Sequence, residues 1–197
     1  MKPLAFTHLG AEIAFYAVFV PFMALELVIR LRSAVNRGGW REDRGSFVLL
    51  YVAVSGGLVG AFVTAINVRA TAITFARWPI FALGIALTAA GVAIRASSFV
   101  LLGRFFTTDV RVHPGQTVVD TGPYRWVRHP SYTGLILILV GLGLALGNWA
   151  SLLIVLVLPT AALVNRIRVE ERALLDGLGE PYRRFAASRA RLLPGVW

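Results

Sequence analysis

The sequence lacks cysteine and is poor in charge, which limits its chemistry before any motif is considered. Without cysteine among its 197 residues, disulfide bonds, thiolate metal sites and cysteine nucleophiles are excluded. Only three histidines are present, His8, His113 and His129, so no metal site is predicted. Charged residues make up 15% and hydrophobic residues 57%, whereas soluble domains usually carry about 25% charged residues. This composition disfavours a soluble helical protein.

The apolar residues fall into blocks of about the length that a bilayer requires. Five blocks predict membrane-spanning helices at about residues 11–29, 46–66, 78–102, 132–146 and 149–165. Gly147 and Asn148 predict a turn, so the last two helices should form a hairpin. The fourth is short for a full crossing, and the fifth is expected to continue as a helix beyond the membrane to about Leu178.

We therefore expect an all-α integral membrane protein that forms one structural domain in two parts. Residues 1–102 supply a three-span membrane region. Residues 103–197 supply an amphipathic cytoplasmic connector, the two-span hairpin and a C-terminal helical tail. Arg95 lies within the third span, where an arginine is costly, so it either faces a partner or extends toward the nearer membrane surface.

The basic residues predict the orientation. Of the 20 lysines and arginines, 16 lie in residues 30–44, 103–130 and 166–197, and three lie on the other side, at Lys2, Arg69 and Arg77. Positive charge accumulates on the cytoplasmic side of membrane proteins, so the N-terminus should lie outside and the C-terminus in the cytoplasm. The net charge of +10 is thus explained by topology and by attraction to membrane lipids, with no nucleic acid partner. A bacterial inner membrane is the expected location.

Two polar stretches, residues 122–134 and 166–185, should meet at the cytoplasmic face. Arginines bind carboxylates through paired hydrogen bonds, glutamates can accept hydrogen bonds from ribose hydroxyls or an ammonium group, and aromatic rings can stack on adenine or face a cation. Together these groups suit a zwitterionic, nucleotide-like ligand at the membrane edge.

Each of these residues also has an ordinary structural interpretation. His129 can begin a helix, and Arg166 and Glu170 have the spacing of a surface ion pair. Gly141 and Gly143 suit either the approach of a ligand or the packing of helices. Tyrosine and tryptophan side chains near a span can serve as interfacial anchors. The residue types alone leave these alternatives open.

The order and spacing of the polar residues are more specific. The pattern is Gly122-Pro123-Tyr124-Arg125-x-x-Arg128-His129-Pro130-x-Tyr132-x-Gly134, then Glu170-Glu171, Gly179-x-x-Tyr182 and Arg191-x-x-Pro194. It resembles the isoprenylcysteine carboxyl methyltransferase family, to which phospholipid methyltransferases are related, over about residues 103–197. The first three spans carry no recognisable motif.

The resemblance implies S-adenosylmethionine as methyl donor and an amphiphilic, lipid-like acceptor that enters between spans. It assigns cofactor binding to Tyr124, His129, Pro130, Tyr132, Gly134, Glu170 and Tyr182, and catalysis to Arg168, Glu171 and Arg128. Arg168 would orient an acceptor carboxylate, which is already ionised at pH 7. An amine acceptor would instead need a base, a role for Glu170 or Glu171.

Two other functions stay open at this point. One is an NADPH-dependent membrane sterol or enone reductase, which would need further basic residues for the cofactor phosphates and a proton donor near the enone. The other is a membrane scaffold or transporter without catalytic activity. Binding of the methyl donor, and its loss on substitution of Arg128, His129 and Glu171, would separate these functions from methyl transfer.

Overall fold

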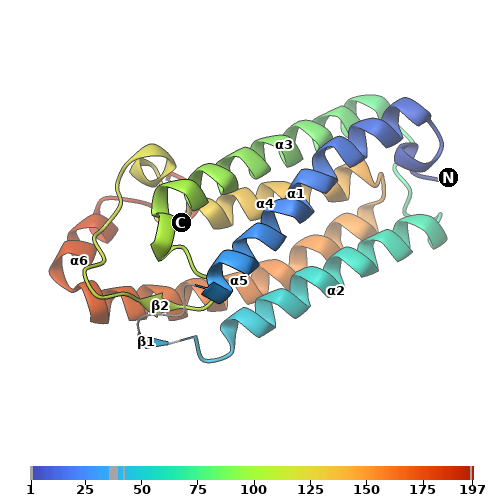
Figure 1. Ribbon diagram of the computed structural model, residues 1–197. Helices are drawn as coiled ribbons and strands as arrows, with labels where there is room; N and C mark the ends of the chain where they lie inside the picture. The colour runs from blue at the N-terminus through green and yellow to red at the C-terminus, as the bar shows by residue number, and fades with distance from the viewer. Residues whose placement is uncertain (1, 36–39, 42, 196) are drawn as a thin grey trace.

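The computed structural model describes residues 2–35, 40, 41, 43–195 and 197. In this part of the chain, five helices form an elongated bundle and a sixth lies beyond one end (Figure 1): α1 Leu9–Val35, α2 Ser46–Asn67, α3 Arg77–Leu102, α4 Pro130–Ala145, α5 Trp149–Leu178 and α6 Glu180–Ala187. Three short 3-10 helices are Leu4–Phe6, Gly103–Phe105 and Gly122–Arg125. The strands β1 Trp40–Arg41 and β2 Arg111–Val112 pair antiparallel.

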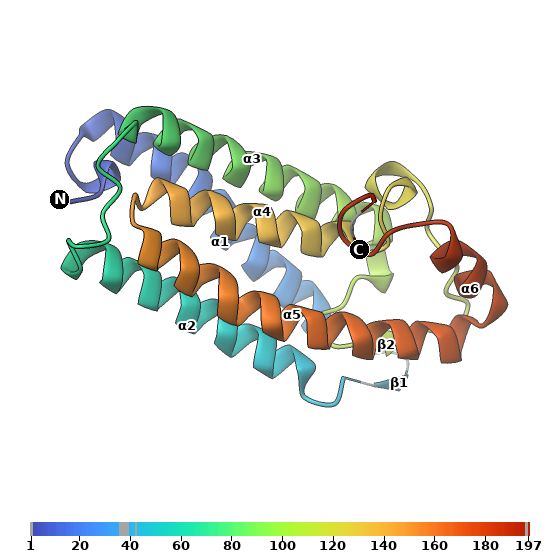
Figure 2. The same ribbon diagram turned by 180° about the vertical axis from the view of Figure 1, so that it is seen from behind.

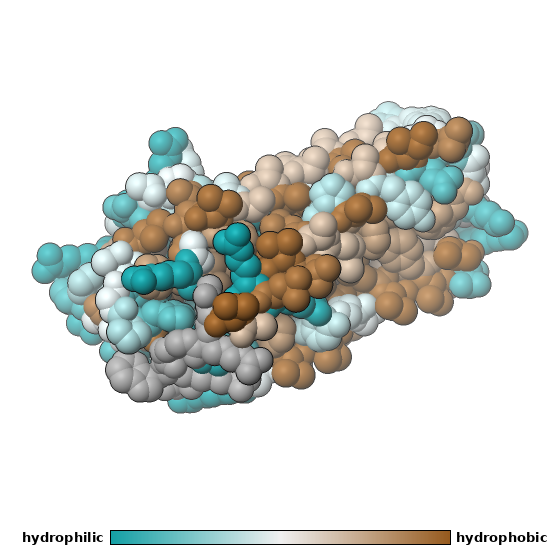
Figure 3. All heavy atoms as spheres, viewed as in Figure 1, coloured by the Kyte–Doolittle hydropathy of each residue, from teal (hydrophilic) through white to brown (hydrophobic). Residues whose placement is uncertain are grey.

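The prediction of an all-α membrane protein is confirmed. Helices α1, α2, α3 and α5 are each long and apolar enough to cross a bilayer, while α4, with 16 residues, is shorter. Large hydrophobic side chains are exposed along the bundle, including Val20, Val59, Val100 and Val157. On the face drawn in Figure 3, hydrophobic residues cover much of the bundle and hydrophilic residues gather toward both ends. An apolar belt with polar ends is the surface that a bilayer selects.

Helix α4 lies inside the bundle, between α3 and α5 (Figure 2). Glycines permit its close contact with α3. A Cβ atom on Gly141 would lie 2.5 Å from the carbonyl oxygen of Gly84, and one on Gly91 would lie 2.5 Å from that of Gly134. Small residues let membrane helices approach backbone to backbone, where dispersion forces are strongest. Gly141 is therefore a helix-packing residue, which resolves one of the alternatives left by the sequence.

The predicted turn between the last two helices is confirmed. Gly147 has a φ of 63°, and the Asn148 side chain caps α5 by accepting a hydrogen bond from the Ser151 amide at 3.1 Å. Asn148 also donates to the carbonyl oxygen of Val68 at 2.8 Å and accepts from the Thr71 hydroxyl at 2.9 Å. The hairpin is thereby tied to the loop between α2 and α3.

Arg95 faces a partner inside the bundle. Its guanidinium binds both carboxylate oxygens of Glu26 on α1, at 2.5 and 3.1 Å, and donates to the Ser131 hydroxyl at 2.7 Å. A buried cation inside a membrane protein is stable only with such partners. This ion pair joins α1 and α3 to the start of α4.

The C-terminal tail returns to the start of α4 (Figure 2). The amides of Arg128 and His129 donate to the carbonyl oxygens of Ala190 and Arg191, at 2.9 and 3.0 Å. The Thr133 hydroxyl donates to the carbonyl oxygen of Leu192 at 2.8 Å. Main-chain bonds therefore hold the tail against residues 128–133.

Candidate functional site

The two polar stretches meet at Glu171, on the part of α5 that extends beyond α4. One carboxylate oxygen of Glu171 lies 3.3 Å from Nε2 of His129 and 3.3 Å from Nη1 of Arg128. The other accepts a hydrogen bond from Nε of Arg191 at 2.9 Å. Residues from the start of α4, from α5 and from the tail thus share one buried carboxylate, which balances the positive charge gathered there.

A second group of contacts continues this network toward the bundle. The Tyr132 hydroxyl donates to Glu170 at 2.6 Å and accepts from Nε of Arg166 at 2.8 Å. The ring of His129 stacks on that of Tyr132, with centroids 5.5 Å apart, and its Nδ1 lies 4.0 Å from Glu170. A line of polar contacts therefore runs from Arg128 to Arg166, and each end of it lines a different cavity.

The first cavity, here called the connector cavity, lies between the connector, α5 and α6 and has about 460 Å³ of space, part of it open to solvent. Its walls include Phe105, Val119, Tyr124, Arg128, Leu178 and Tyr182. Within the described residues, Nε of Arg128 and the hydroxyl of Tyr182 are buried without a hydrogen-bond partner. Such atoms cost about 1–3 kcal/mol each when left unpaired, so their presence in a cavity wall indicates a polar ligand.

Both tyrosines of the connector cavity are held in their protonated form. Burial, followed by the charge of Glu170, raises the pKa of Tyr124 and of Tyr182 above the usual value for tyrosine. Tyr124 donates to the carbonyl oxygen of Ser98 at 3.4 Å. The Tyr182 hydroxyl is therefore the one of the two that has a free proton to offer a ligand.

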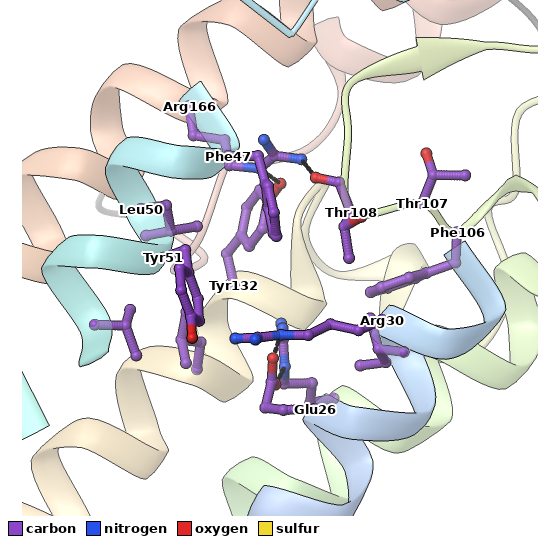
Figure 4. Close-up of a pocket in the computed structure, with 14 residues that line it drawn as sticks. Glu26, Arg30, Phe47, Leu50, Tyr51, Phe106, Thr107, Thr108, Tyr132 and Arg166 are labelled. Atoms are coloured by element: carbon purple, nitrogen blue, oxygen red, sulfur yellow. Dashed lines mark hydrogen bonds and ion pairs between the residues drawn. The ribbon is translucent and has the colours of Figure 1, made fainter. Parts of the chain in front are cut away.

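The second cavity, here called the membrane chamber, lies within the bundle and encloses about 600 Å³, part of it open to solvent (Figure 4). Apolar side chains such as Leu50, Val54 and Leu135 form much of its wall. Its charged groups, among the described residues, are Arg166, the Glu26–Arg95 pair and Arg30, whose guanidinium lies 4.0 Å from the centroid of the Tyr51 ring. Polar groups beside an apolar wall suit an amphiphilic ligand.

Three of the predicted site residues lie outside the polar network and both cavities. Arg168 is exposed, whereas Arg166, two positions earlier and about 200° around the helix, is buried and lines the membrane chamber. Gly134 packs on Gly91 of α3 rather than lining either cavity. Pro130 is buried as the first residue of α4. The remaining predicted residues belong to the polar network or to the wall of the connector cavity: Tyr124, Arg128, His129, Tyr132, Glu170, Glu171 and Tyr182.

Asp43 is not among the residues predicted from the sequence, and Arg166 appeared there only as a possible surface ion pair with Glu170. Nη1 of Arg166 lies 2.8 Å from Oδ1 of Asp43, and both side chains are buried, with exposed fractions of 4% and 0%. An acidic residue shortly before Ser46 signals the start of a helix. Its pairing with an arginine 123 residues away had no local signal.

Comparison with known proteins places these contacts in a family context. The profile of the Isoprenylcysteine carboxyl methyltransferase (ICMT) family matches residues 82–176. The chain is 26% identical to Protein-S-isoprenylcysteine O-methyltransferase of Schizosaccharomyces pombe over 190 residues, which cover 87% of this chain and 78% of the relative. It is 32% identical to Protein-S-isoprenylcysteine O-methyltransferase A of Arabidopsis thaliana over 123 residues, which cover 60% of this chain and 61% of the relative.

A bacterial relative and a solved structure are also similar. The uncharacterized protein YpbQ of Bacillus subtilis is 33% identical over 95 residues, which cover 48% of this chain and 56% of YpbQ. The structure of the eukaryotic intramembrane Ras methyltransferase ICMT superposes with a TM-score of 0.67 at 20% identity, covering 98% of this chain and 70% of that chain. The fold is therefore shared, although the chain spans only 56% of YpbQ and 61% of the Arabidopsis relative.

Proposed function

We propose that the chain is a member of the isoprenylcysteine carboxyl methyltransferase family, which it resembles in sequence and in fold, and that it is an integral membrane methyltransferase. It transfers a methyl group from S-adenosylmethionine to the carboxylate of an isoprenylcysteine-like or other amphiphilic acceptor. The observation that carries this proposal is the polar line from Arg128 to Arg166, which joins a cavity with unpaired donors to an amphiphilic chamber in the bundle.

The connector cavity is proposed as the donor site. Its fit rests on the two buried unpaired groups, Nε of Arg128 and the hydroxyl of Tyr182, which can donate to carboxylate or ribose oxygens. The Tyr124 ring in the same wall offers a face to a base or a cation. Glu171 holds Arg128 and His129 in place, and the main-chain bonds from the tail fix the same segment. S-adenosylmethionine supplies a methyl group that is already activated by its sulfonium.

The membrane chamber is proposed as the acceptor site. Leu50, Val54 and Leu135 would cover an apolar tail, and Arg166 would orient the carboxylate. Arg166 thus takes the role that the resemblance gave to Arg168. An ionised carboxylate needs no general base, so the protein contributes chiefly by alignment and by excluding water. Membrane lipids around α1 and α2 would deliver such an acceptor from the bilayer.

The two other functions are not favoured, since the relatives from Schizosaccharomyces pombe and Arabidopsis thaliana are named as methyltransferases. The decisive experiment uses purified protein with radiolabelled S-adenosylmethionine and an N-acetylated S-isoprenylcysteine. We expect donor binding and methyl transfer, and loss of both on Arg128→Ala, His129→Ala and Glu171→Ala. Arg168→Ala is the matched control, because its exposed side chain is absent from the site. Binding of NADPH but not of S-adenosylmethionine would favour a reductase and refute the proposal.

We also propose a bacterial inner membrane location with the C-terminus in the cytoplasm. The excess of arginine at the ends that carry the connector and the tail supports this orientation, and it gives the connector cavity access to a cytoplasmic donor. A reporter fused after Trp197 should be active only in the cytoplasm. Activity on the outer side would reverse the topology.

A further inference from the structure

The guanidinium of Arg166 is almost fully occupied by the protein itself. Nε donates to the Tyr132 hydroxyl at 2.8 Å, and Nη1 donates to Asp43 at 2.8 Å and to the Ser46 hydroxyl at 3.1 Å. Nη2 donates to the carbonyl oxygen of Thr108. A guanidinium has five N–H donors, so within the part of the chain that the structure describes these four contacts leave one N–H, on Nη2. Arg166 also lines the membrane chamber (Figure 4).

Asp43 is the negatively charged residue among these partners of Arg166. It lies between α1 and α2, is fully buried, and pairs with Arg166 of α5. Burial would raise the pKa of its carboxyl group, but the hydrogen bond and charge of Arg166 and the Phe47 amide outweigh burial and hold the pKa below its usual value. Asp43 is therefore ionised at neutral pH and offsets the positive charge that faces the acceptor.

Capping of α2 explains only part of this arrangement. Asp43 accepts hydrogen bonds from the Phe47 amide at 3.2 and 3.3 Å and from the Ser46 hydroxyl at 3.0 Å. Asparagine and serine cap helices about as well as aspartate, so the cap does not require a carboxylate. A charge buried this deeply is costly unless it is paired, and the partner here is the arginine of the acceptor site.

We propose that Asp43 is a positioning residue that holds the fork of Arg166 and leaves a single donor for the acceptor carboxylate. This inference rests on the proposed function and adds a reason why Arg166 holds the acceptor carboxylate less tightly than a free arginine would. A bidentate, uncompensated arginine would bind the carboxylate tightly and lower its reactivity as a nucleophile. An arginine already paired with Asp43 orients the carboxylate through one N–H and leaves its other lone pairs free to attack.

The wild-type protein offers a first test that involves no substitution. Equilibrium binding would be measured for an N-acetylated S-isoprenylcysteine and for its methyl ester, which lacks the carboxylate charge. One charge-assisted hydrogen bond predicts that the acid binds about tenfold more tightly than the ester. A preference of about a thousandfold would mean that the full fork is available, which would overturn the proposal. Equal affinity, or no binding of the acid, would overturn it as well.

Asp43→Asn is the second test, since asparagine keeps the shape and the helix cap while removing the charge. We expect the acid to bind about tenfold more tightly, the methyl ester to bind as before, and kcat to fall about tenfold while KM falls or stays constant. A merely structural role would lower stability and leave the acid-to-ester ratio unchanged. Asp43→Ser gives a second charge-free cap if the asparagine variant folds poorly.

Two controls separate this inference from the proposed function. Asp120→Asn removes an exposed acid from the connector and should leave the acid-to-ester ratio at its wild-type value. In an Arg166→Gln background, Asp43→Asn should have no further effect on this ratio, because Asp43 acts through the arginine. If Asp43→Asn changes the acid-to-ester affinity ratio as expected but the protein transfers no methyl group, the proposed function alone is refuted. If the protein transfers the methyl group but Asp43→Asn leaves this ratio unchanged, the positioning role alone is refuted.

Discussion

His129 and Glu171 are 42 residues apart in the sequence, yet Nε2 of the histidine lies 3.3 Å from a carboxylate oxygen of the glutamate. His129 directly precedes α4, and Glu171 lies on the part of α5 that continues beyond α4, so the contact joins these two helices. Arg128 and Arg191 bind the same carboxylate, at 3.3 and 2.9 Å. Glu171 is thus the residue through which the connector, α5 and the tail are held together.

We predict that Glu171→Gln weakens binding of S-adenosylmethionine about a hundredfold. The amide keeps the size of the side chain but leaves the largely buried Arg128 without its counter-charge and removes that of the partly exposed Arg191. Breaking a buried ion pair in this way costs about 3 kcal/mol. Equilibrium binding of labelled donor measures the effect. Glu180→Gln is the control, because the Glu180 carboxylate is about half exposed and, among the described residues, pairs with exposed arginines. Donor affinity within twofold of the wild type for Glu171→Gln would contradict this role.

The membrane helices were predictable because bilayer thickness sets the length of apolar blocks. The expected end of the last helix, near Leu178, agrees with α5. The helix of the first block is longer than predicted, Leu9–Val35 instead of 11–29, because hydropathy marks the part of a helix in lipid and not its continuation past the membrane. The partner of Arg95 was not predictable, since Glu26 lies 69 residues earlier on another helix.

The candidate site was predictable where it depends on residues close together in the sequence. It was not predictable where it depends on the rotation of a helix about its axis or on an ion pair between residues far apart in the sequence. The predicted hairpin indicated that the stretches carrying His129 and Glu171 meet at one membrane face. The family resemblance assigned the acceptor carboxylate to Arg168, whereas the structure turns Arg166 inward, because the rotation of α5 follows from how the whole bundle packs. Asp43 was missed for a related reason: its local signal is a helix start, and its ion pair forms only after α2 and α5 have packed.

Arg166 and Arg168 offer a paired test of the proposed acceptor site. Arg166→Lys should lower kcat/KM for the carboxylate acceptor about a hundredfold, since an ammonium cannot keep the contacts to Tyr132, Asp43 and Thr108 that the planar guanidinium makes together. Arg168→Lys should stay within twofold of the wild type because its side chain is exposed. Steady-state kinetics with both variants measures this difference. The reverse order of effects would restore Arg168 as the acceptor-orienting residue.

The contact between α3 and α4 predicts a second pair of variants. Gly141→Ala should destabilise the protein by about 2 kcal/mol or more, since its Cβ would lie 2.4 Å from the Thr88 hydroxyl and 2.5 Å from the Gly84 carbonyl oxygen. Gly56→Ala is the matched control, because a Cβ there meets nothing within 4 Å, and alanine favours the helix. Thermal unfolding in detergent compares the two. A melting temperature for Gly141→Ala equal to that of the wild type would contradict the packing role.

His113 in the connector predicts how stability changes with pH. Burial, followed by the charges of Arg111 and Arg104, lowers the pKa of His113 below its usual value of 6.5. The unfolded chain therefore binds a proton at a pH where the folded chain does not, so stability must rise with pH through this interval. It follows that the stability contribution is complete above pH 6.5 and is lost as the pH falls toward the lower pKa of the folded state.

Thermal unfolding at pH 7.5 and 5.5 tests this prediction. The melting temperature of the wild type should fall more on acidification than that of His113→Gln, which carries no titrating group at this position. His8→Gln is the control, since His8 is exposed near the N-terminus and its loss should leave the wild-type response unchanged. Equal falls for the wild type and His113→Gln would show that protonation of His113 does not oppose folding. Because the connector forms a wall of the connector cavity, the same acidification should also weaken donor binding in the wild type more than in His113→Gln.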